Sequence, residues 1–349
     1  MTRRPRIRDV AELAGVAPST VSVVLNDTAG ARVAGSTRDR VRAAAAELGY
    51  VPNSFARGLR TQRSGTLAFI GDVIATTPYA GDLIQGAQEA AWEAGYLLIL
   101  VNTGGDAELE ERAVQALRRQ QVEGALYATM YHRAVTLPEV LDGLPTVLLD
   151  ARPVSGPATF VVPDEQTGAE DAVEELAGQG HRRIAFVRDL NDGPAVDRRQ
   201  RGYEARLAAH GLELDERLVV RERSDSAGGE RATAVLLDVP DPPTAVFAFN
   251  DQMAIGVYRA AAARGVRIPQ DLSVIGFDDL YVVSSELTPG LTTMALPHRE
   301  MGRLAARALI AELDGGEPAG EHLVPCPIVR RGSVAPPLTR TRSSSRRRG

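Results

Sequence analysis

Residues Ile7 to Asn26 read IRDVAELAGVAPSTVSVVLN, and this stretch predicts two short helices joined by a turn. In the first helix an apolar face recurs at helical spacing up to Gly15, and it consists of Ile7, Val10, Ala11 and Ala14. Pro18 suits the first position of the second helix, because a missing N–H costs nothing there. The inner side of this second helix carries Val21, Val24 and Leu25.

Two short helices joined by a glycine-containing turn form a helix-turn-helix, whose second helix fits the major groove of DNA. Small hydroxyl side chains on that helix can reach phosphates or base edges. The alternative interpretation is an ordinary helical hairpin that does not contact DNA. The candidate DNA contacts in this part of the chain are Pro18, Ser19, Thr20, Ser22, Val23 and Asn26.

A third predicted helix and the distribution of charge both favour DNA binding. Residues 36–49 (STRDRVRAAAAELG) predict an amphipathic helix with Gly49 as its C-cap and an inner side of Val41, Ala44, Ala45 and Leu48. Residues 1–65 contain eleven Arg against five Asp and Glu, whereas the whole chain has a net charge of −5. A basic head on an acidic body indicates that the head, and not the body, meets phosphate.

The composition excludes several classes of protein. The chain has 349 residues, more than one ordinary domain, and its single cysteine, Cys326, cannot form an internal disulfide. Cys326 is expected in a buried strand within LVPCPIV. The five His are scattered without ligand partners at close spacing, so we expect no metal site and no cofactor. No apolar run approaches about 18 residues and no signal peptide is evident, so we expect a cytoplasmic, nucleoid-associated protein.

From Thr66 onward strands alternate with helices, which predicts doubly wound parallel sheets. The first unit has predicted strands at 66–74, 96–101 and 124–129 and helices at 82–94 and 109–120, with segments 140–144 and 146–149 completing it. A second unit begins near Pro163, with predicted strands at 184–187, 218–221, 245–249 and 273–276 and helices at 167–179, 199–210, 229–237 and 252–264. Such units fit an enzyme, a solute-binding protein or a sensor. We expect no enzyme, because no nucleophile elbow, phosphate loop or acid–base cluster is evident.

Several motifs resemble the lactose/galactose repressor family of bacterial transcription factors. In the head these are DVAELAGV, the run Thr20 to Ser22, the pairs Leu25-Asn26 and Thr37-Arg38, and the run around Gly49-Tyr50 and Pro52-Asn53. In the body they are GDLIQGAQEAAWEAGY, residues 243–279 and LVPCPIVRRGSVAPP. The resemblance extends from about Ile7 to Pro337. It implies a DNA-binding transcriptional regulator, expected to be a repressor, whose operator affinity is controlled by a small-molecule effector.

The resemblance also implies the domain organisation. The expected fold is α/β, with an N-terminal helix-turn-helix head, a hinge helix and a two-lobed, doubly wound effector domain similar to periplasmic binding proteins. The expected ranges are 1–50 for the head, 51–63 for the hinge, 64–162 and 291–322 for the first lobe, 163–290 and 323–333 for the second lobe, and 334–349 for a disordered basic tail.

By the same resemblance, the hinge helix binds DNA when two subunits meet. Leu59 matches the leucine that wedges into the minor groove and kinks the duplex, and the alternative is a leucine with a packing role. Val23 stands where the family commonly has a guanine-reading arginine, so a different operator sequence is expected. Ala17 replaces the usual serine cap of the recognition helix. The other hinge residues implied in DNA contact are Asn53, Ala56, Arg57 and Arg60.

The resemblance places the effector between the two lobes, beyond the carboxyl ends of the strands. The resemblance implies that Arg199 and Asp278 contact the effector. The alternatives are that Arg199 is a solvated surface arginine and that Asp278 with Asp279 caps a following helix. His132 is assigned neither to the site nor to the surface. A sugar is the leading effector class, and a nucleoside or another metabolite acting as corepressor is the alternative. The implied effector contacts are Tyr79, Asp150, Arg199, Asn250 and Asp278.

The expected partners are double-stranded operator DNA, the effector and a second copy of the chain, with no membrane. A homodimer is expected because the basic tail TRTRSSSRRRG lacks the leucine heptads that form tetramers in one family member. A solute-binding protein is the remote alternative. It would explain the body of the chain, but it would leave the helix-turn-helix head without a role.

Overall fold

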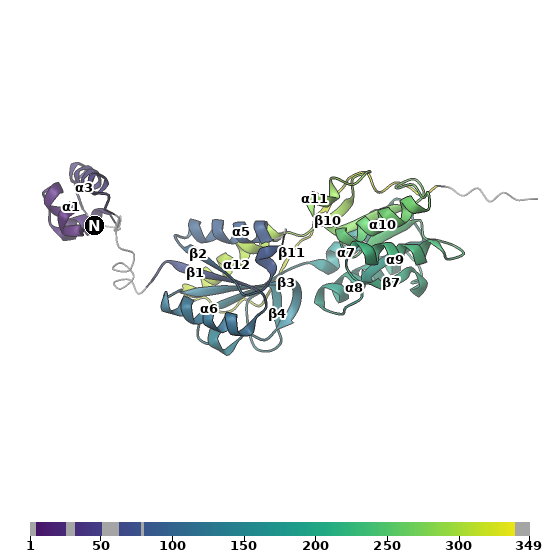
Figure 1. The fold of residues 1–349 in the computed structure, drawn as a ribbon, viewed down its shortest axis with the longest axis horizontal. Helices are drawn as coiled ribbons and strands as arrows, with labels where there is room; N and C mark the ends of the chain where they lie inside the picture. Colours follow the sequence, from purple (N-terminus) through teal and green to yellow (C-terminus); the bar gives the residue numbers. More distant parts are fainter. Residues whose placement is uncertain (1–4, 26–31, 51–62, 78–79, 339–349) are drawn as a thin grey trace, which may run out of the picture. The chain divides into compact units, whose positions relative to one another are not determined.

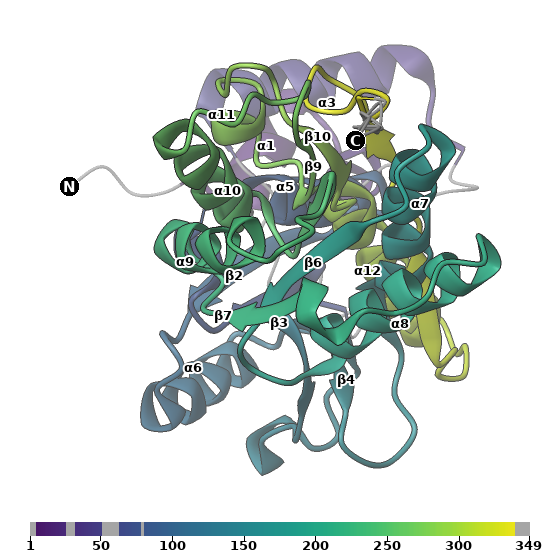
Figure 2. The ribbon, with the colours of Figure 1, turned by 90° about the vertical axis from the view of Figure 1, so that its right-hand side faces the viewer.

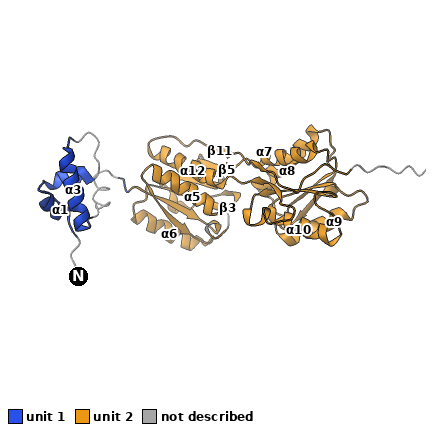
Figure 3. Ribbon diagram, turned by 90° about the horizontal axis from the view of Figure 1, so that it is seen from above, with its two compact units in different colours: residues 1–64 blue, residues 65–349 orange. Residues whose placement is uncertain are grey.

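The computed structural model describes residues 5–25, 32–50, 63–77 and 80–338. The chain divides into two compact units, residues 1–64 and residues 65–349 (Figure 3). Each unit has its own hydrophobic core.

The described part of the first unit folds into α1 (Ile7–Ala14), α2 (Pro18–Leu25) and α3 (Gly35–Leu48). Gly15 and Gly49 end α1 and α3 with φ values of 64° and 62°, a left-handed conformation that glycine adopts without strain. The predicted helix-turn-helix and third helix are therefore confirmed. The three helices bury one small core, which consists of Val10, Ala11, Ala14, Val21, Val24, Val41, Ala44 and Ala45.

The second unit contains two six-stranded sheets, and the first has the strand order β11-β5-β4-β3-β1-β2 with every pair parallel. Helices α5 (Ala80–Glu93) and α12 (His298–Leu313) cover one face of it, and α6 (Ala107–Arg119) covers the other (Figure 1). We call this sheet with its helices the first lobe. Its strands are β1 (Thr66–Gly71), β2 (Leu97–Asn102), β3 (Gly124–Val135), β4 (Thr146–Pro153), β5 (Phe160–Pro163) and β11 (Glu321–Val324), with 3-10 turns η1 (Ile74–Thr76) and η2 (Glu139–Leu141).

Alternation along β1 explains the two covered faces of the first lobe. Leu67 and Phe69 belong to the core beneath α5 and α12, whereas Ala68 and Ile70 belong to the core beneath α6. Successive side chains of a strand point to opposite faces, so a strand covered on both sides is apolar throughout. The near-continuous apolar run of β1, TLAFIG, is therefore typical of a central strand that is covered on both faces.

The second sheet has the order β12-β10-β9-β8-β6-β7, and its pairs are parallel except for the antiparallel pair β10–β12. Helices α7 (Glu165–Gly178) and α8 (Pro194–Ala209) lie on one face, and α9 (Ser226–Leu237) and α10 (Asp251–Ala263) on the other (Figure 2). We call this the second lobe. It also contains β6 (Ile184–Asp189), β7 (Val219–Glu222), β8 (Ala245–Ala248), β9 (Ser273–Asp278), β10 (Thr292–Ala295), β12 (Ile328–Val329), η3 (Glu216–Leu218) and α11 (Tyr281–Ser284).

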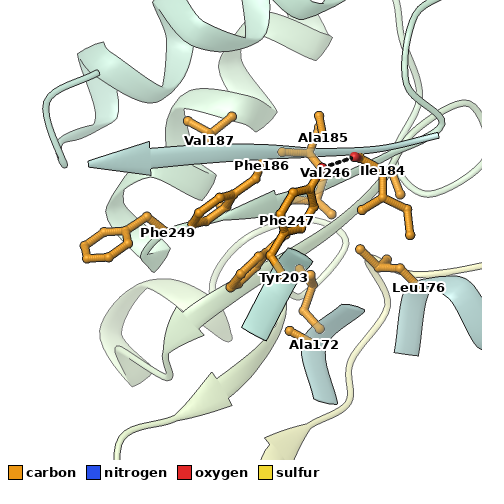
Figure 4. Close-up of a cluster of buried hydrophobic side chains, with 14 of the residues drawn as sticks. Ala172, Leu176, Ile184, Ala185, Phe186, Val187, Tyr203, Val246, Phe247 and Phe249 are labelled. Carbon is orange, nitrogen blue, oxygen red and sulfur yellow. Dashed lines mark hydrogen bonds between the residues drawn. The ribbon is translucent and has the colours of Figure 1, made fainter. Parts of the chain in front are cut away.

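Aromatic side chains fill the core of the second lobe (Figure 4). The rings of Phe186 and Phe247 stack with centroids 4.9 Å apart, and the ring of Tyr203 lies 5.3 Å from that of Phe186. The Tyr203 hydroxyl donates a 2.8 Å hydrogen bond to the carbonyl oxygen of Ile184. These contacts hold α8, the helix that carries Arg199, firmly against the sheet.

Glycines allow the paired helices to approach closely. A Cβ added at Gly86 of α5 would lie 1.9 Å from the carbonyl oxygen of Arg299, and one at Gly302 of α12 would lie 2.0 Å from that of Leu83. In the second lobe, a Cβ at Gly229 of α9 would lie 2.1 Å from the carbonyl oxygen of Met253 on α10. Only a residue without a side chain fits at these crossings.

The chain passes between the two lobes three times between residues 160 and 330, and two of the predicted lobe boundaries are wrong. The range 291–322 was assigned to the first lobe, but β10 pairs with β9 and β12 in the second lobe, so the second passage follows β10. The range 323–333 was assigned to the second lobe, but Leu323 and Val324 of β11 pair with β5 in the first lobe. Prolines mark both true boundaries, because Pro297 precedes α12 and Pro325 and Pro327 separate β11 from β12.

Some predicted elements also differ in position. Cys326 is buried as expected, but it lies between β11 and β12 rather than in a strand. Helix α8 begins at Pro194 rather than Arg199, because Gly193 and Pro194 provide a helix start. Segment 140–144 forms the turn η2 and the chain after it, and the short strand β5 had no counterpart in the prediction.

Two further observations concern the described residues alone. None of their helices is both long and apolar enough to cross a membrane. No group of three or more His, Cys, Asp or Glu side chains among them is placed to hold a metal ion.

Candidate functional site

Helix α2 presents its polar residues away from the core of the head. Its apolar side is buried with Val21 and Val24, and the candidate DNA contacts are exposed or half-buried: Pro18, Ser19, Thr20, Ser22 and Val23. The carbonyl oxygen of Ala17 accepts hydrogen bonds from the first turn of the helix. An alanine side chain cannot cap the helix N-terminus, whose N–H groups and positive dipole end suit a phosphate.

Several predicted contacts lie outside the described residues, so their predicted roles stay predictions. Those assigned to DNA are Asn26, Asn53, Ala56, Arg57, Leu59 and Arg60, and the one assigned to the effector is Tyr79.

Arg199 lies at the centre of a buried charged cluster in the second unit. It is 3% exposed, and its Nη2 lies 3.0 Å from Oε1 of Glu165 and 3.7 Å from Oδ1 of Asp278. Its Nη1 donates to the carbonyl oxygen of Phe249, and its guanidinium lies 4.4 Å and 3.7 Å from the ring centroids of Phe249 and Phe277. The alternative interpretation of Arg199 as a solvated surface arginine is therefore wrong.

Glu165 is the acidic partner of Arg199, and sequence reasoning missed it. It is the first residue of α7, directly after the N-cap Asp164, and it is 2% exposed. Burial raises the pKa of Glu165, but the nearby Arg199 and His132 outweigh that effect and hold the pKa below its ordinary value. An acidic residue in the first turn of a helix is so common that the sequence offers no signal for this role.

His132 joins the cluster from the first lobe. It is 4% exposed, and its Nδ1 lies 3.6 Å from Oε2 of Glu165. The register of β3 against β4 shifts between Ala128 and Arg133, and β3 resumes pairing beyond that irregularity. The shifted segment places His132 beside the first turn of α7, so the question about His132 that the sequence left open is answered: its side chain is buried.

Asp150 lies on β4, with φ at 53°, in the left-handed region that disfavours a residue with a side chain. It is 8% exposed. Burial, followed by repulsion from Glu165, raises the pKa of Asp150 well above its ordinary value. The protonated, neutral form of this carboxyl group is therefore favoured relative to that of an exposed aspartate.

The remaining predicted effector contacts differ in their surroundings. Asp278 has φ at 120° and faces Arg199, whereas it is Asp279 that accepts from the Ser284 hydroxyl of α11. The helix-cap alternative therefore describes Asp279 better than Asp278. Asn250 caps α10: its Oδ1 accepts from the N–H of Met253, and its Nδ2 donates to the carbonyl oxygen of Ser224. Local structure therefore already uses both polar atoms of Asn250.

Several buried polar atoms of this cluster have no hydrogen-bond partner within the part of the chain that the structure describes. They are Nδ1 and Nε2 of His132, Oδ1 of Asp150, Oε2 of Glu165 and Nε of Arg199. A buried polar atom without a partner costs about 1–3 kcal/mol, and more when it is charged. Five such atoms in one cluster indicate a site built to hold a polar ligand.

Comparison with known proteins shows what this combination of head and body is. Residues 6–53 match the family model described as bacterial regulatory proteins, lacI family, and residues 173–334 match a periplasmic binding protein-like domain. The chain is 34% identical over 331 residues to the ribose operon repressor of Escherichia coli (strain K12), covering 94% of this chain and 99% of that protein. The chain belongs to the LacI family of bacterial regulatory proteins.

Solved structures of the LacI family share the whole architecture. The lac repressor dimer bound to operator and an anti-inducer matches with a TM-score of 0.77 and 26% identity, covering 95% of this chain and all of that one. A complex of the transcriptional regulator CelR with cellobiose matches with a TM-score of 0.67 and 33% identity over 95% of this chain. This LacI-family chain is thus a DNA-binding transcriptional regulator with a two-lobed effector domain.

Proposed function

We propose that this chain represses transcription by binding operator DNA through α2, and that a small molecule bound at the Arg199 cluster controls that binding. The observation that carries the proposal is the convergence of partnerless buried polar atoms from both lobes on one place. A ligand held there contacts both lobes at once. It therefore changes the affinity for DNA to the extent that it binds one lobe arrangement better than another.

We infer that the effector contacts include Arg199, Asp278 and Asp150. Arg199 is fixed by two aromatic rings and offers its Nε, while Asp150 offers its carboxyl oxygen Oδ1. The related CelR regulator binds cellobiose, which supports a sugar as the leading class. A nucleoside or another metabolite that acts as corepressor is the alternative, and it predicts the opposite sign of the response.

The proposed assembly on DNA is a homodimer acting in the cytoplasm, as a regulator and not as an enzyme. The lac repressor relative binds its operator as a dimer. One short recognition helix per chain offers too little surface for the specificity of an operator, and two copies double it. The hinge residues around Leu59 are proposed to bind the minor groove between the two recognition helices.

The test of this function is a DNA-binding titration of the full chain with and without candidate effectors. Arg199→Ala and Asp278→Ala are expected to abolish the effect of the effector on operator affinity while operator affinity itself changes little. Arg206→Ala is the matched control, because Arg206 lies on the same helix but pairs with Glu170 and Glu174 away from the cluster. A full effector response in both cluster variants would place the effector site elsewhere.

A further inference from the structure

We propose that Val23 of α2 recognises thymine in the operator, through contact between its methyl groups and the C5 methyl group of the base. The inference rests on the proposed function, because it assigns the base chemistry that α2 recognises in the major groove. It implies that each half-site of the operator carries an A·T pair opposite Val23.

The structure separates Val23 from the other apolar residues in the second half of α2. Val21 and Val24 are buried in the core of the head and Leu25 packs against that core, whereas within the described part of the head Val23 belongs to neither group. At 3.6 residues per turn, Val23 points about 160° away from Val21 around the helix axis. Its side chain is half-buried, and the exposed Ser19 lies on the same face one turn earlier. The methyl groups of Val23 are therefore presented on the side of α2 that faces away from the core.

The chemistry of α2 matches thymine better than any other base. The helix reads PSTVSVVL, without an amide, a carboxylate or a basic side chain. Guanine is recognised by Arg or Lys, adenine by Asn or Gln, and cytosine by Asp or Glu, whereas a hydroxyl group bonds with several bases. Thymine alone presents a methyl group in the major groove, and apolar side chains recognise it by contact. Val23 therefore suits thymine and offers nothing to the other three bases.

The size of the effect follows from the apolar surface that the contact buries. Removing one methyl-sized group from water changes an affinity roughly fourfold. The proposed homodimer makes the contact once in each half-site, so replacement of both thymines is expected to weaken binding about tenfold or more. The preference is thus small at one position and readily measured over the whole operator.

The first experiment selects binding sites for the full chain from random double-stranded DNA and replaces each symmetric pair of thymines by uracil. Uracil pairs as thymine does and lacks only the C5 methyl group. We expect one pair of replacements to weaken specific binding about tenfold at a fixed salt concentration. No weakening at any pair would overturn the inference and leave the proposed function intact, whereas failure to select any sequence would contradict the proposed function.

The second experiment repeats the uracil comparison with Val23→Ala. The protein change and the DNA change delete the same contact, so Val23→Ala is expected to bind the thymine and uracil operators equally. A folding defect would instead weaken binding to both operators alike. Leu13→Ala on α1 is the matched control, because Leu13 is an apolar residue of the same head that is 48% exposed, and it is expected to keep the full preference for thymine.

Val23→Thr is the second variant, and it keeps one methyl group and the shape of the side chain. It is expected to show an intermediate preference for thymine, and it serves as the test where Val23→Ala does not fold. A full preference for thymine in Val23→Ala, or an unchanged preference in Val23→Thr where that variant is the test, would remove Val23 from base recognition.

The third experiment restores the methyl group on a different base. The T·A pair opposite Val23 is replaced by C·G, and the cytosine is then methylated at C5, which returns a methyl group to the same place in the major groove. We expect the wild type to bind the methylated operator more tightly than the unmethylated one, and Val23→Ala to bind both equally. Equal binding of the two operators by the wild type would contradict the methyl contact.

Discussion

Asp150 and Asp278 show how single residues are adapted at the carboxyl ends of the two sheets. Both are non-glycine residues with positive φ, at 53° and 120°, on strands β4 and β9. Such backbone conformations cost on the order of 1–3 kcal/mol and persist where the surrounding structure requires them. Asp278 faces Arg199, and Asp150 lies near enough to Glu165 and Arg199 for their charges to shift its pKa, so the strain accompanies the proposed ligand site.

Asp251 carries a prediction about pH. Its buried carboxyl group accepts from the Thr293 hydroxyl at 2.6 Å and from the N–H of Leu280 at 2.8 Å, and burial raises its pKa to about 7. The folded state therefore holds a proton that the unfolded chain has released above about pH 4. The contribution of Asp251 to stability is complete below that pH, and it falls as the pH rises towards the folded-state pKa of about 7.

The variant Asp251→Asn keeps an amide of the same shape and cannot titrate. The wild-type free energy of unfolding is expected to fall between about pH 5 and pH 8 by more than that of the variant, with a difference on the order of a few kcal/mol. Chemical denaturation at both pH values measures this, with Asp238→Asn at an exposed carboxyl as control. Parallel pH profiles for wild type and Asp251→Asn would refute the assignment.

At the scale of residues, the sequence identified part of the cluster and missed the rest for a physical reason. Arg199 and Asp278 follow from the family resemblance and Asp150 from its place at a strand end, and the structure brings all three into one cluster. Glu165 looks like any acidic residue at a helix N-terminus, and its burial depends on Arg199, which lies far along the chain. His132 reaches the cluster through the register shift in β3, which no local pattern reveals.

At the scale of elements, the crossing of α5 and α12 provides a stability prediction. Gly302→Ala is expected to destabilise the effector domain by about 1–3 kcal/mol or more, because its Cβ would lie 2.0 Å from the carbonyl oxygen of Leu83. Gly81→Ala on α5 is the matched control, since nothing lies within 4 Å of a Cβ there. That control is expected to be neutral, or to stabilise by at most about 1 kcal/mol. Thermal unfolding of both variants is the measurement, and equal effects would argue against close packing at Gly302.

Several longer elements and the short strands β7 and β8 were predicted close to their positions, whereas other short strands were not. Apolar periodicity over many residues predicts helices and central strands from the sequence. The helices α5, α7 and α10 and the strand β1 accordingly lie close to their predicted positions. The strands β5, β10 and β11 span only four residues each, too few for a period to be visible. Their pairing is decided by strands distant in sequence, and this is why two predicted lobe boundaries were wrong.

At the scale of the whole molecule, we expect two copies of the chain to bind one pseudo-palindromic operator with half-sites about one helical turn apart. The reason is that each chain supplies a single recognition helix, α2, of only eight residues. Footprinting combined with measurement of the mass of the complex on DNA tests this. Tight, sequence-specific binding of one copy to a single half-site is the result that would rule it out.

The buried position of Cys326 has a practical consequence for watching this molecule move. The thiol is 4% exposed on the last passage between the lobes, and the Cβ of Cys326 would lie 3.1 Å from a Cβ added at Gly168 of α7. Burial also raises the pKa of the thiol, so reaction with a disulfide reagent needs its surroundings to open first. Because the sequence contains no other cysteine, the absorbance change produced by such a reagent reports the reaction of the Cys326 sulfur alone. The rate of this reaction in the unaltered chain therefore reports how often the packing around Cys326 opens, and a ligand that stabilises the folded effector domain is expected to slow it.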